Sequence, residues 1–370
     1  MAKKANSLTH LALHKFKKNL WGVLSFYFIL LCAVIAVFAY VLAPDNSANA
    51  NQMHLSIHSM SPGFSVKMLK IPDEVKEKNS KLKQLFYGKT VGGEEIPIAG
   101  YTFKNENLEV ELFTREGLEI IHREFNLSEN FPENLSNKEI EEEFIYQKKF
   151  LLGTDKYGRD FLSRILIGTR ISLSIGFVAV LISLIIGISL GALAGFYGGK
   201  IDNFIMWLIN VTWSIPTLLL VIAMTLALGK GFWQVFIAVG LTMWVEVARV
   251  VRGQVMGVKE LQYITAAKAL GYKNLKIITQ HILPNVMAPV IVISAANFAS
   301  AILVESGLSF LGIGAQPPIP SWGAMIKEHY SYIVLGKAYL AIIPGLAIMS
   351  LVLAFMLIGN ALRDALDVKT

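Results

Sequence analysis

The sequence predicts an all-α membrane protein of six transmembrane helices, with a small α+β domain inserted between the first two. Three observations lead to this expectation. Of the 370 residues, 54% are hydrophobic and only 16% are charged, whereas soluble chains carry about 25% charged residues. Long stretches lack Asp, Glu, Lys and Arg altogether, and one long stretch is acidic instead. The composition excludes a disordered chain, and the single cysteine, Cys32, excludes a disulfide framework within the chain.

Six apolar segments set the number of expected helices. Five of them have 24 to 29 uncharged residues, and a helix of that length crosses a hydrocarbon core of about 30 Å. The sixth has 15 residues before Glu246, and it can span if Glu246 and Arg249 lie near an interface or face other protein. Prolines 317, 318 and 320 argue against a helix in residues 306–326. The six segments are Leu20–Ala43, Ile171–Gly199, Asn203–Gly229, Gly231–Val245, Ile277–Val304 and Ala338–Leu362.

Basic residues predict the orientation in the membrane. Lys15, Lys17 and Lys18 precede the first apolar segment, which places the N-terminus in the cytoplasm. With 24 residues this segment exceeds the apolar core of a cleaved signal peptide, which has about 7–15 residues, so we expect an uncleaved anchor. Six helices return the C-terminus to the same side, where the basic loop 252–284 also lies.

Residues 44–150, here called the insertion, do not belong to the membrane part. They carry 13 Lys and Arg against 18 Asp and Glu, a net charge of −5, and the topology places them outside the cytoplasm. Ser136 and Glu139 form the capping box of a helix expected through Lys149. The other expected elements are a helix at 73–86 and strands at 96–103, 108–113 and 118–125. The expected organisation is residues 1–43 with the N-terminus and first helix, the insertion at 44–150, and a core of five helices at 151–370.

Neither a catalytic nor a metal-binding constellation is visible. His54 and His58 lie four residues apart, but no Asp, Glu or Cys at matching spacing completes a ligand set, so we expect a strand with solvated histidines. The stretch 198–200 lacks the first glycine and the Ser or Thr of a phosphate loop, so ATP must bind elsewhere. The net charge of +7, in so apolar a chain, indicates a membrane rather than nucleic acid.

Small residues, prolines and one carboxylate mark the predicted helices. A stripe of small residues allows close approach between helices, within this chain rather than between two copies. Pro216 and Pro344 should kink their helices. Glu305 lies between two long uncharged stretches, either as part of a transport path or gate or as an interfacial carboxylate bonded to the nearby loop. The stripe consists of Ser183, Gly187, Gly191 and Gly195.

The loop 252–284 contains the most informative pattern. Lys259–Leu270 is expected to be a helix that ends at Gly271, and a second short helix, Asn274–Ile282, should stop near Pro284. The first helix has a small apolar face flanked by lysines, which suits either a groove on a partner protein or the lipid surface. The face comprises Tyr263, Ala266, Ala267 and Leu270.

At this loop the chain resembles the permease subunits of type I ABC importers, whose loop carries Glu-Ala-Ala, a glycine four residues on and a closing Leu-Pro. Ala266, Ala267, Gly271 and the stretch 282–284 match this pattern, whereas Thr265 stands in place of the Glu. Three further stretches are similar to C-subunit permeases for dipeptides, oligopeptides and nickel. They are Leu152–Asp160, Glu305–Gly323 and Leu362–Asp367. The insertion departs from this family, whose loop at this place is much shorter.

The resemblance implies the type I importer permease architecture and a set of partners. A second homologous permease would form the other half of the path in the bilayer, and two cytoplasmic ATPases would bind ATP and Mg²⁺. An extracytoplasmic solute-binding protein would deliver the solute, a di- or oligopeptide, at a bacterial inner membrane. This chain would hold no cofactor, bind no nucleic acid and catalyse no reaction. The implied path or gate residues are Pro216 and Glu305, and those that couple to the ATPase are Tyr263, Thr265, Ala266, Ala267, Leu270, Gly271 and Pro284.

Two other classes of protein stay open. A secondary transporter would need coupling-ion residues at mid-membrane and usually inverted repeats, but the sequence shows few buried charges and no repeat. A membrane sensor with an extracytoplasmic domain fits the insertion, yet it leaves the loop pattern and the Glu305 stretch unexplained.

Overall fold

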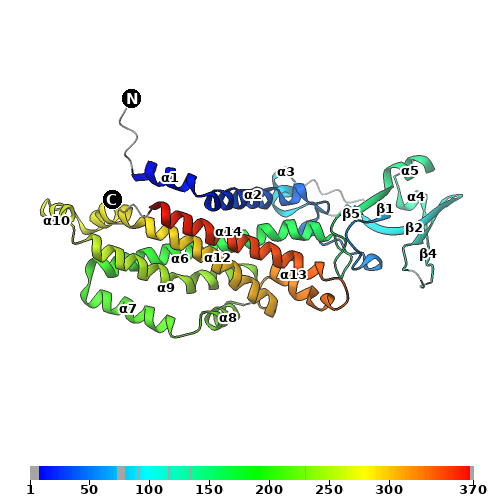
Figure 1. Cartoon of the computed structure of the whole chain (residues 1–370). Helices are drawn as coiled ribbons and strands as arrows, with labels where there is room; N and C mark the ends of the chain where they lie inside the picture. The colour runs from blue at the N-terminus through cyan, green and yellow to red at the C-terminus, as the bar shows by residue number, and fades with distance from the viewer. Residues whose placement is uncertain are drawn as a thin grey trace, which may run out of the picture.

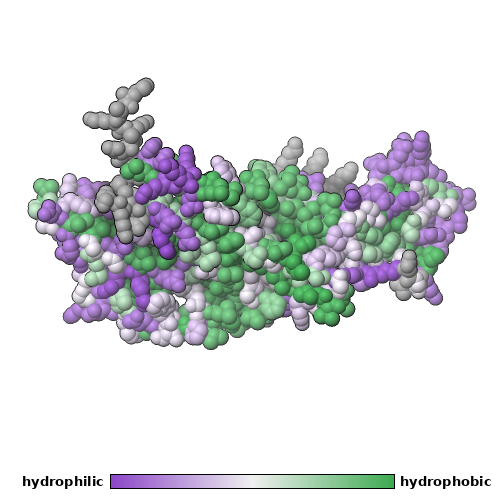
Figure 2. Space-filling view, viewed as in Figure 1, coloured by the Kyte–Doolittle hydropathy of each residue, from purple (hydrophilic) through white to green (hydrophobic). Residues whose placement is uncertain are grey.

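The computed structural model describes residues 8–72, 80–90, 92–115, 117, 119–132, 135–229 and 231–366. The molecule is elongated, with a bundle of long helices along most of its length and a β-sheet at one end (Figure 1). Helix α1 (Leu8–Lys18), the end of the C-terminal helix and the short helix α10 gather at the opposite end. The surface between these ends is mostly hydrophobic, whereas both ends are hydrophilic (Figure 2). This distribution suits a protein that crosses a bilayer.

Within the described residues, five helices are long and apolar enough to cross a membrane. They are α2 (Leu20–Leu42), α6 (Phe161–Tyr197), α9 (Phe232–Val258), α12 (Leu283–Leu311) and α14 (Tyr339–Leu366). A bent pair, α7 (Gly199–Trp213) and α8 (Thr217–Leu228), makes a sixth if the pair is one span. The prediction of one kinked helix there is wrong, since the pair turns by 91° and Pro216 lies between its two helices. A proline disfavours helical backbone in the residue before it, which explains the break.

Several helices extend beyond their uncharged segments. Helix α6 begins ten residues before Ile171, where the side chain of Asp160 accepts a hydrogen bond from the backbone N–H of Ser163 at 2.8 Å. Helix α12 passes Glu305 and ends at Leu311, so the expectation of no helix from 306 onward is wrong for this stretch. The absence of charged residues identifies the apolar core of a span, whereas capping residues determine where the helix begins and ends.

The insertion contains a five-stranded antiparallel sheet in the order β4-β3-β2-β1-β5. One face of this sheet packs on α5, where Ile140 and Phe144 join Leu69, Ile98 and Val110 in a buried cluster. The strands are β1 (Phe64–Ile71), β2 (Glu94–Lys104), β3 (Asn107–Leu112), β4 (His122–Asn126) and β5 (Ile145–Phe150). The helices are α3 (Lys81–Tyr87), α4 (Leu127–Asn130) and α5 (Asn137–Phe144).

The predicted elements of the insertion are partly right. Strands β2, β3 and β4 lie at the predicted places with shifted ends, and the Ser136–Glu139 capping box is present. The helix predicted through Lys149 is wrong beyond Phe144, because the chain turns into β5 and pairs with β1. In the helix predicted at 73–86, residues 73–79 lie outside the described residues, and α3 starts at Lys81.

A hydrogen-bonded seam joins the sheet to the helical bundle. Backbone bonds run from His54 N to Tyr157 O at 3.1 Å, from Ser59 N to Asp155 O at 2.7 Å and from Thr154 N to Met60 O at 3.1 Å. The seam thus connects residues 54–60 to residues 154–157, and the latter lead directly into α6. The prediction of a strand with solvated histidines is wrong here: His54 is buried beside the short 3₁₀ helix η2 (Leu55–Ile57).

Candidate coupling loop and translocation elements

Helix α10 (Gln262–Ala269) is the predicted loop helix, and it is shorter than expected. Helix α9 continues to Val258 and Lys259 caps it, so the predicted start at 259 is wrong. Gly271 follows α10 with a φ of +76°, in the left-handed region that glycine adopts without strain. A side chain at Gly271 would meet nothing within 4 Å, so this glycine is required by the backbone and not by packing.

The apolar residues of α10 divide between two faces. Ile264 and Ala267 are buried in a cluster with Val255 of α9 and Val286 of α12. Leu270, by contrast, is 77% exposed and Tyr263 is 43% exposed. The prediction of one shared face is therefore wrong for Ala267. This residue lies three positions after Ile264, on the same side of the helix, and both face the bundle. Ile264 was not part of the predicted face, yet it is the largest buried side chain of α10.

The outward side of α10 is a largely apolar surface that is exposed in the described part of the chain. Its residues are Tyr263, Thr265, Ala266 and Leu270, all of them exposed. We call this set the α10 outer face. Because the inner side is anchored in the bundle, a push on the outer face would be transmitted to α9 and α12.

The chain after α10 runs into α12 without a stop. Helix α11 (Asn274–Lys276) and the π-helical turn η3 (Ile277–Ile282) continue directly into α12. Pro284 thus lies inside a continuous helical segment, directly after the π-helical turn, and the prediction of a helix that stops there is wrong. The Asn285 amide donates to the Tyr263 hydroxyl at 3.2 Å, which ties α10 to the start of α12.

The predicted stripe of small residues packs on α9 within the chain. A Cβ on Gly187 would lie 2.5 Å from the Cβ of Val247, and one on Gly191 would lie 2.5 Å from the backbone oxygen of Ala248. Gly195 is equally close to α9, and Ser183 is buried. The absence of side chains brings α6 and α9 into close contact, so these helices are expected to move together.

Polar groups gather at the break between α7 and α8. A pocket of about 190 Å³ behind Pro216 is lined by residues that include Thr212, Thr217 and Glu246. Below the break, Arg252 of α9 donates two hydrogen bonds to the Asp202 carboxylate, at 2.5 and 2.6 Å. This bidentate pair holds α7 to α9, and α8 packs on α9 through Val221, which is buried with Val235 and Phe236.

Glu305 is completely buried in α12. The Ser309 hydroxyl donates to its carboxylate at 2.6 Å, and Ser309 in turn accepts bonds from Ser321 at 3.1 Å and from the Ala315 N–H at 3.2 Å. These bonds secure the loop that follows α12. The Glu305 carboxylate thus reaches the loop through Ser309 of its own helix, and both interpretations of Glu305 stay predictions.

A buried ionic network at the start of α6 was not predicted from the sequence. Arg159 pairs with Asp155 at 2.6 Å and with Glu328 at 3.1 Å, and Arg164 lies 3.6 Å from Asp155. Arg159 also donates to the Asn51 side chain at 3.2 Å. Arg159 and Glu328 are 169 positions apart in the sequence, so only the fold brings them together.

The same network has the spacing of a metal site but not its chemistry. Ligand atoms of Asp155, Glu328 and His329 lie within 4.8 Å of one another. Arg159, however, already neutralises both carboxylates, and Nε2 of His329 accepts the backbone N–H of Lys156 at 3.3 Å. The donor atoms are therefore committed to the protein, and the group is a structural network between the insertion and the bundle.

Comparison with known proteins places this geometry in a family. The family model described as the binding-protein-dependent transport system inner membrane component matches residues 187–370. The N-terminal TM domain of oligopeptide transport permease C matches residues 7–62. The sheet of the insertion lies between these two matches.

Curated relatives agree with the family models. A glutathione transport system permease protein of Pectobacterium atrosepticum is 44% identical over 218 residues, 59% of this chain and 72% of the relative. A di/tripeptide transport system permease protein of Pseudomonas aeruginosa is 44% identical over 224 residues, 60% of this chain and 73% of the relative. A dipeptide transport system permease protein of Bacillus subtilis is 41% identical over 217 residues, 59% of this chain and 68% of the relative. The chain therefore belongs to the inner-membrane permease components of binding-protein-dependent ABC importers.

Proposed function

We propose that this chain forms half of the translocation path of an ATP-driven importer of di- or oligopeptides, and that α10 couples it to a cytoplasmic ATPase. The α10 outer face is the observation that carries the proposal. It exposes Leu270 and Tyr263 while Ile264 and Ala267 anchor the same helix to α9 and α12. A helix that is anchored on one side and apolar on the other suits a groove on a partner protein.

The proposed partners follow from the family. A second permease supplies the other half of the path, two ATPases bind ATP and Mg²⁺, and a solute-binding protein delivers the solute. Peptides are the proposed solute class because the relatives described above are named for glutathione, dipeptides and di/tripeptides. The path would open and close as the bent pair α7 and α8 changes its angle at Pro216.

The proposed orientation places α10 and both termini in the cytoplasm and the insertion outside. The two groups lie at opposite ends of the bundle, as this topology requires (Figure 1). The insertion then stands on the side from which solute arrives. Its net charge of −5 differs in sign from the rest of the chain, and we propose that it contacts the solute-binding protein. Deletion of residues 48–147 should abolish uptake that depends on this protein, and normal uptake would remove the idea.

A single substitution on the outer face tests the coupling role. Leu270→Asp places a carboxylate where the proposed partner contributes an apolar groove, and Leu270 makes few contacts within its own chain. The tagged variant should be produced in normal amounts but retain at least about tenfold less ATPase in a pull-down, the effect of losing one buried anchor.

The matched control is Val334→Asp, which adds the same charge at a residue that is 91% exposed at the other end of the bundle. It should retain the ATPase fully. If Leu270→Asp retains as much ATPase as the control, the α10 outer face is not the docking site.

A further inference from the structure

Arg170 is a partly buried cation at the start of an apolar stretch of α6. It immediately precedes the 29 uncharged residues that begin at Ile171, and within the described residues its guanidinium forms no salt bridge. One of its nitrogens donates to the backbone oxygen of Leu85 at 3.3 Å. The rings of Tyr40 and Phe86 lie 5.7 and 5.1 Å from the guanidinium. A partly buried cation at the edge of a membrane segment, held by rings and one carbonyl, leaves donors for an anion.

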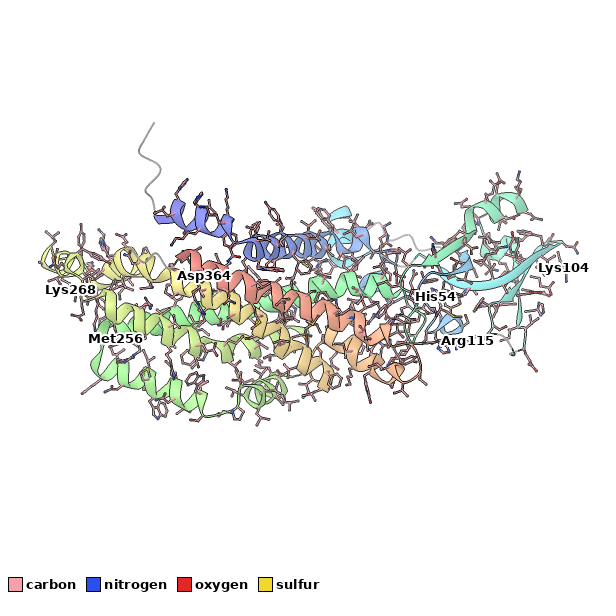
Figure 3. All side chains as sticks on the ribbon, in the orientation of Figure 1. His54, Lys104, Arg115, Met256, Lys268 and Asp364 are labelled. Atoms are coloured by element: carbon pink, nitrogen blue, oxygen red, sulfur yellow. The ribbon has the colours of Figure 1, made fainter. Side chains whose placement is uncertain are left out.

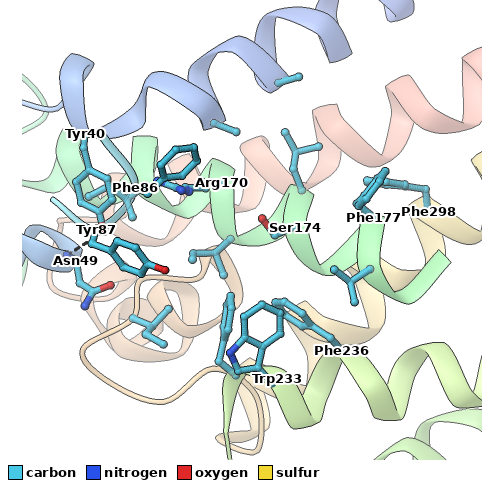
Figure 4. A pocket seen from close by; sticks show the side chains of 18 of the residues that line it. Tyr40, Asn49, Phe86, Tyr87, Arg170, Ser174, Phe177, Trp233, Phe236 and Phe298 are labelled. Carbon is cyan, nitrogen blue, oxygen red and sulfur yellow. Dashed lines mark hydrogen bonds between the residues drawn. The ribbon is translucent and has the colours of Figure 1, made fainter. Parts of the chain in front are cut away.

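A large cavity opens beside Arg170. Its volume is about 760 Å³, and it lies between α2, α6 and α9, with α3 of the insertion at its edge. Tyr40, Tyr87, Asn49 and Arg170 gather at one end, as Figure 4 shows. The remaining walls are almost entirely apolar.

The two ends of the cavity lie at different depths in the membrane. Tyr40 is two residues from the end of α2, and Arg170 borders the apolar stretch of α6, so both belong to the membrane boundary. Ile29, Phe298 and Phe355 line the same cavity and lie in the middle parts of α2, α12 and α14. The cavity therefore runs from a cationic, aromatic mouth at the boundary into an apolar interior.

We propose that this cavity is a binding site for one anionic phospholipid of the surrounding membrane. Arg170 would bind the phosphate oxygens with its free donors, and Asn49 and Tyr87 would contact the headgroup. An acyl chain would lie along Ile29, Phe298 and Phe355. A peptide carboxylate fits the Arg170 end equally well, but the long apolar interior matches an acyl chain and offers a peptide backbone no hydrogen-bond partners.

The site would give the lipid a structural role that does not depend on the solute. Helix α3 belongs to the insertion and lies over Arg170, whereas α2 and α6 belong to the bundle. A bound phospholipid would fill the space between them and hold the insertion against the membrane boundary.

The test uses the assembled transporter purified from its membranes in mild detergent. Native mass spectrometry with added phosphatidylglycerol, and with phosphatidylcholine as the neutral comparison, counts the lipids retained. Wild type should retain phosphatidylglycerol preferentially. Arg170→Gln should weaken this retention at least about tenfold, the effect of losing a hydrogen bond to a charged group. Ala33→Trp, which fills the cavity and leaves Arg170 in place, should weaken it too.

A matched control and three outcomes keep the proposal falsifiable. Arg123→Gln removes an arginine of the exposed sheet strand β4 and should leave retention unchanged. Equal retention in Arg170→Gln and wild type would overturn the proposal. Displacement of the lipid by a dipeptide would assign the site to solute instead. Crosslinking of Phe177→Cys, at the cavity wall, to the second permease would show that a partner helix fills it.

Discussion

The two ends of the molecule are built in opposite ways. At the sheet end, near His54 and Arg115 in Figure 3, backbone hydrogen bonds and the buried Arg159–Asp155 ion pair tie the insertion to the bundle. At the loop end, near Met256 and Lys268, α10 leaves the side chains of Tyr263 and Leu270 exposed. Close packing of α6 on α9 joins the two ends. The sheet end is thus held by contacts within the chain, whereas the loop end is where we propose that an ATPase binds.

The largest expected effect comes from breaking the sheet end. Asp155→Ala leaves Arg159 and Arg164 buried beside an empty site, and removing one partner of a buried ion pair costs about 3–5 kcal/mol. Thermal unfolding in detergent and protease cleavage of residues 44–60 should both reveal the loss. Glu109→Ala, which breaks an exposed pair with Lys104, should leave the unfolding midpoint unchanged. Equal midpoints for the two variants would show that the network does not hold this end.

A smaller effect is expected from breaking the connection between the ends. Gly191→Val forces a side chain against the backbone of Ala248, and overpacking of this kind costs about 1–3 kcal/mol. Gly253→Val is the control, because a side chain there meets nothing within 4 Å. The unfolding midpoint and the yield of Gly191→Val should fall well below those of Gly253→Val. If the two variants unfold alike, α6 and α9 are not tightly packed through this stripe.

The stability of the sheet end should depend on pH through His54. Burial lowers the pKa of His54, and Lys148 acts in the same direction against the smaller opposite effects of Glu95 and Asp45. The folded protein therefore keeps this histidine neutral where an unfolded chain, with a pKa of about 6.5, takes up a proton. Stability is full above about pH 6.5 and declines as the pH falls below it.

Hydrogen exchange measures this effect at the seam. Exchange in residues 54–60 should quicken between pH 7.5 and pH 5.5, after correction for the intrinsic rate, while exchange in α10 should not. His54→Gln should remove most of the difference. The same pH response in His54→Gln would locate the sensitivity in other groups.

Local patterns predicted much of the membrane part and less of the rest. Uncharged segments located the spans because exclusion of charge from lipid is a property of each segment alone. The capping box at Ser136 was found for the same reason, since its partners are three residues apart. The outer face of α10 was predicted only in part. Ala267 is buried because it packs against Val255 of α9 and Val286 of α12, and the sequence of α10 alone does not show these contacts.

Features that depend on distant partners were missed. Strand β5 has two lysines and no clear alternation, and it is a strand because β1 lies beside it. The ion pairs of Arg159 were not predicted, because its partner Glu328 lies 169 positions later in the sequence. The break at Pro216 was expected as a kink, since sequence alone does not show how far a proline will bend a helix.

The central claim is that α10 transmits the motion of an ATPase to the bundle, and Gly271 tests it most directly. Gly271→Val strains a backbone of positive φ without touching a neighbour, so it should disturb the end of α10 and little else. Gly271→Asn is the control, because asparagine tolerates this conformation. The measurement is solute uptake per ATP hydrolysed in the reconstituted importer. The account predicts continued hydrolysis with a several-fold fall in uptake for Gly271→Val and near-normal coupling for Gly271→Asn, and unchanged uptake in Gly271→Val would contradict it.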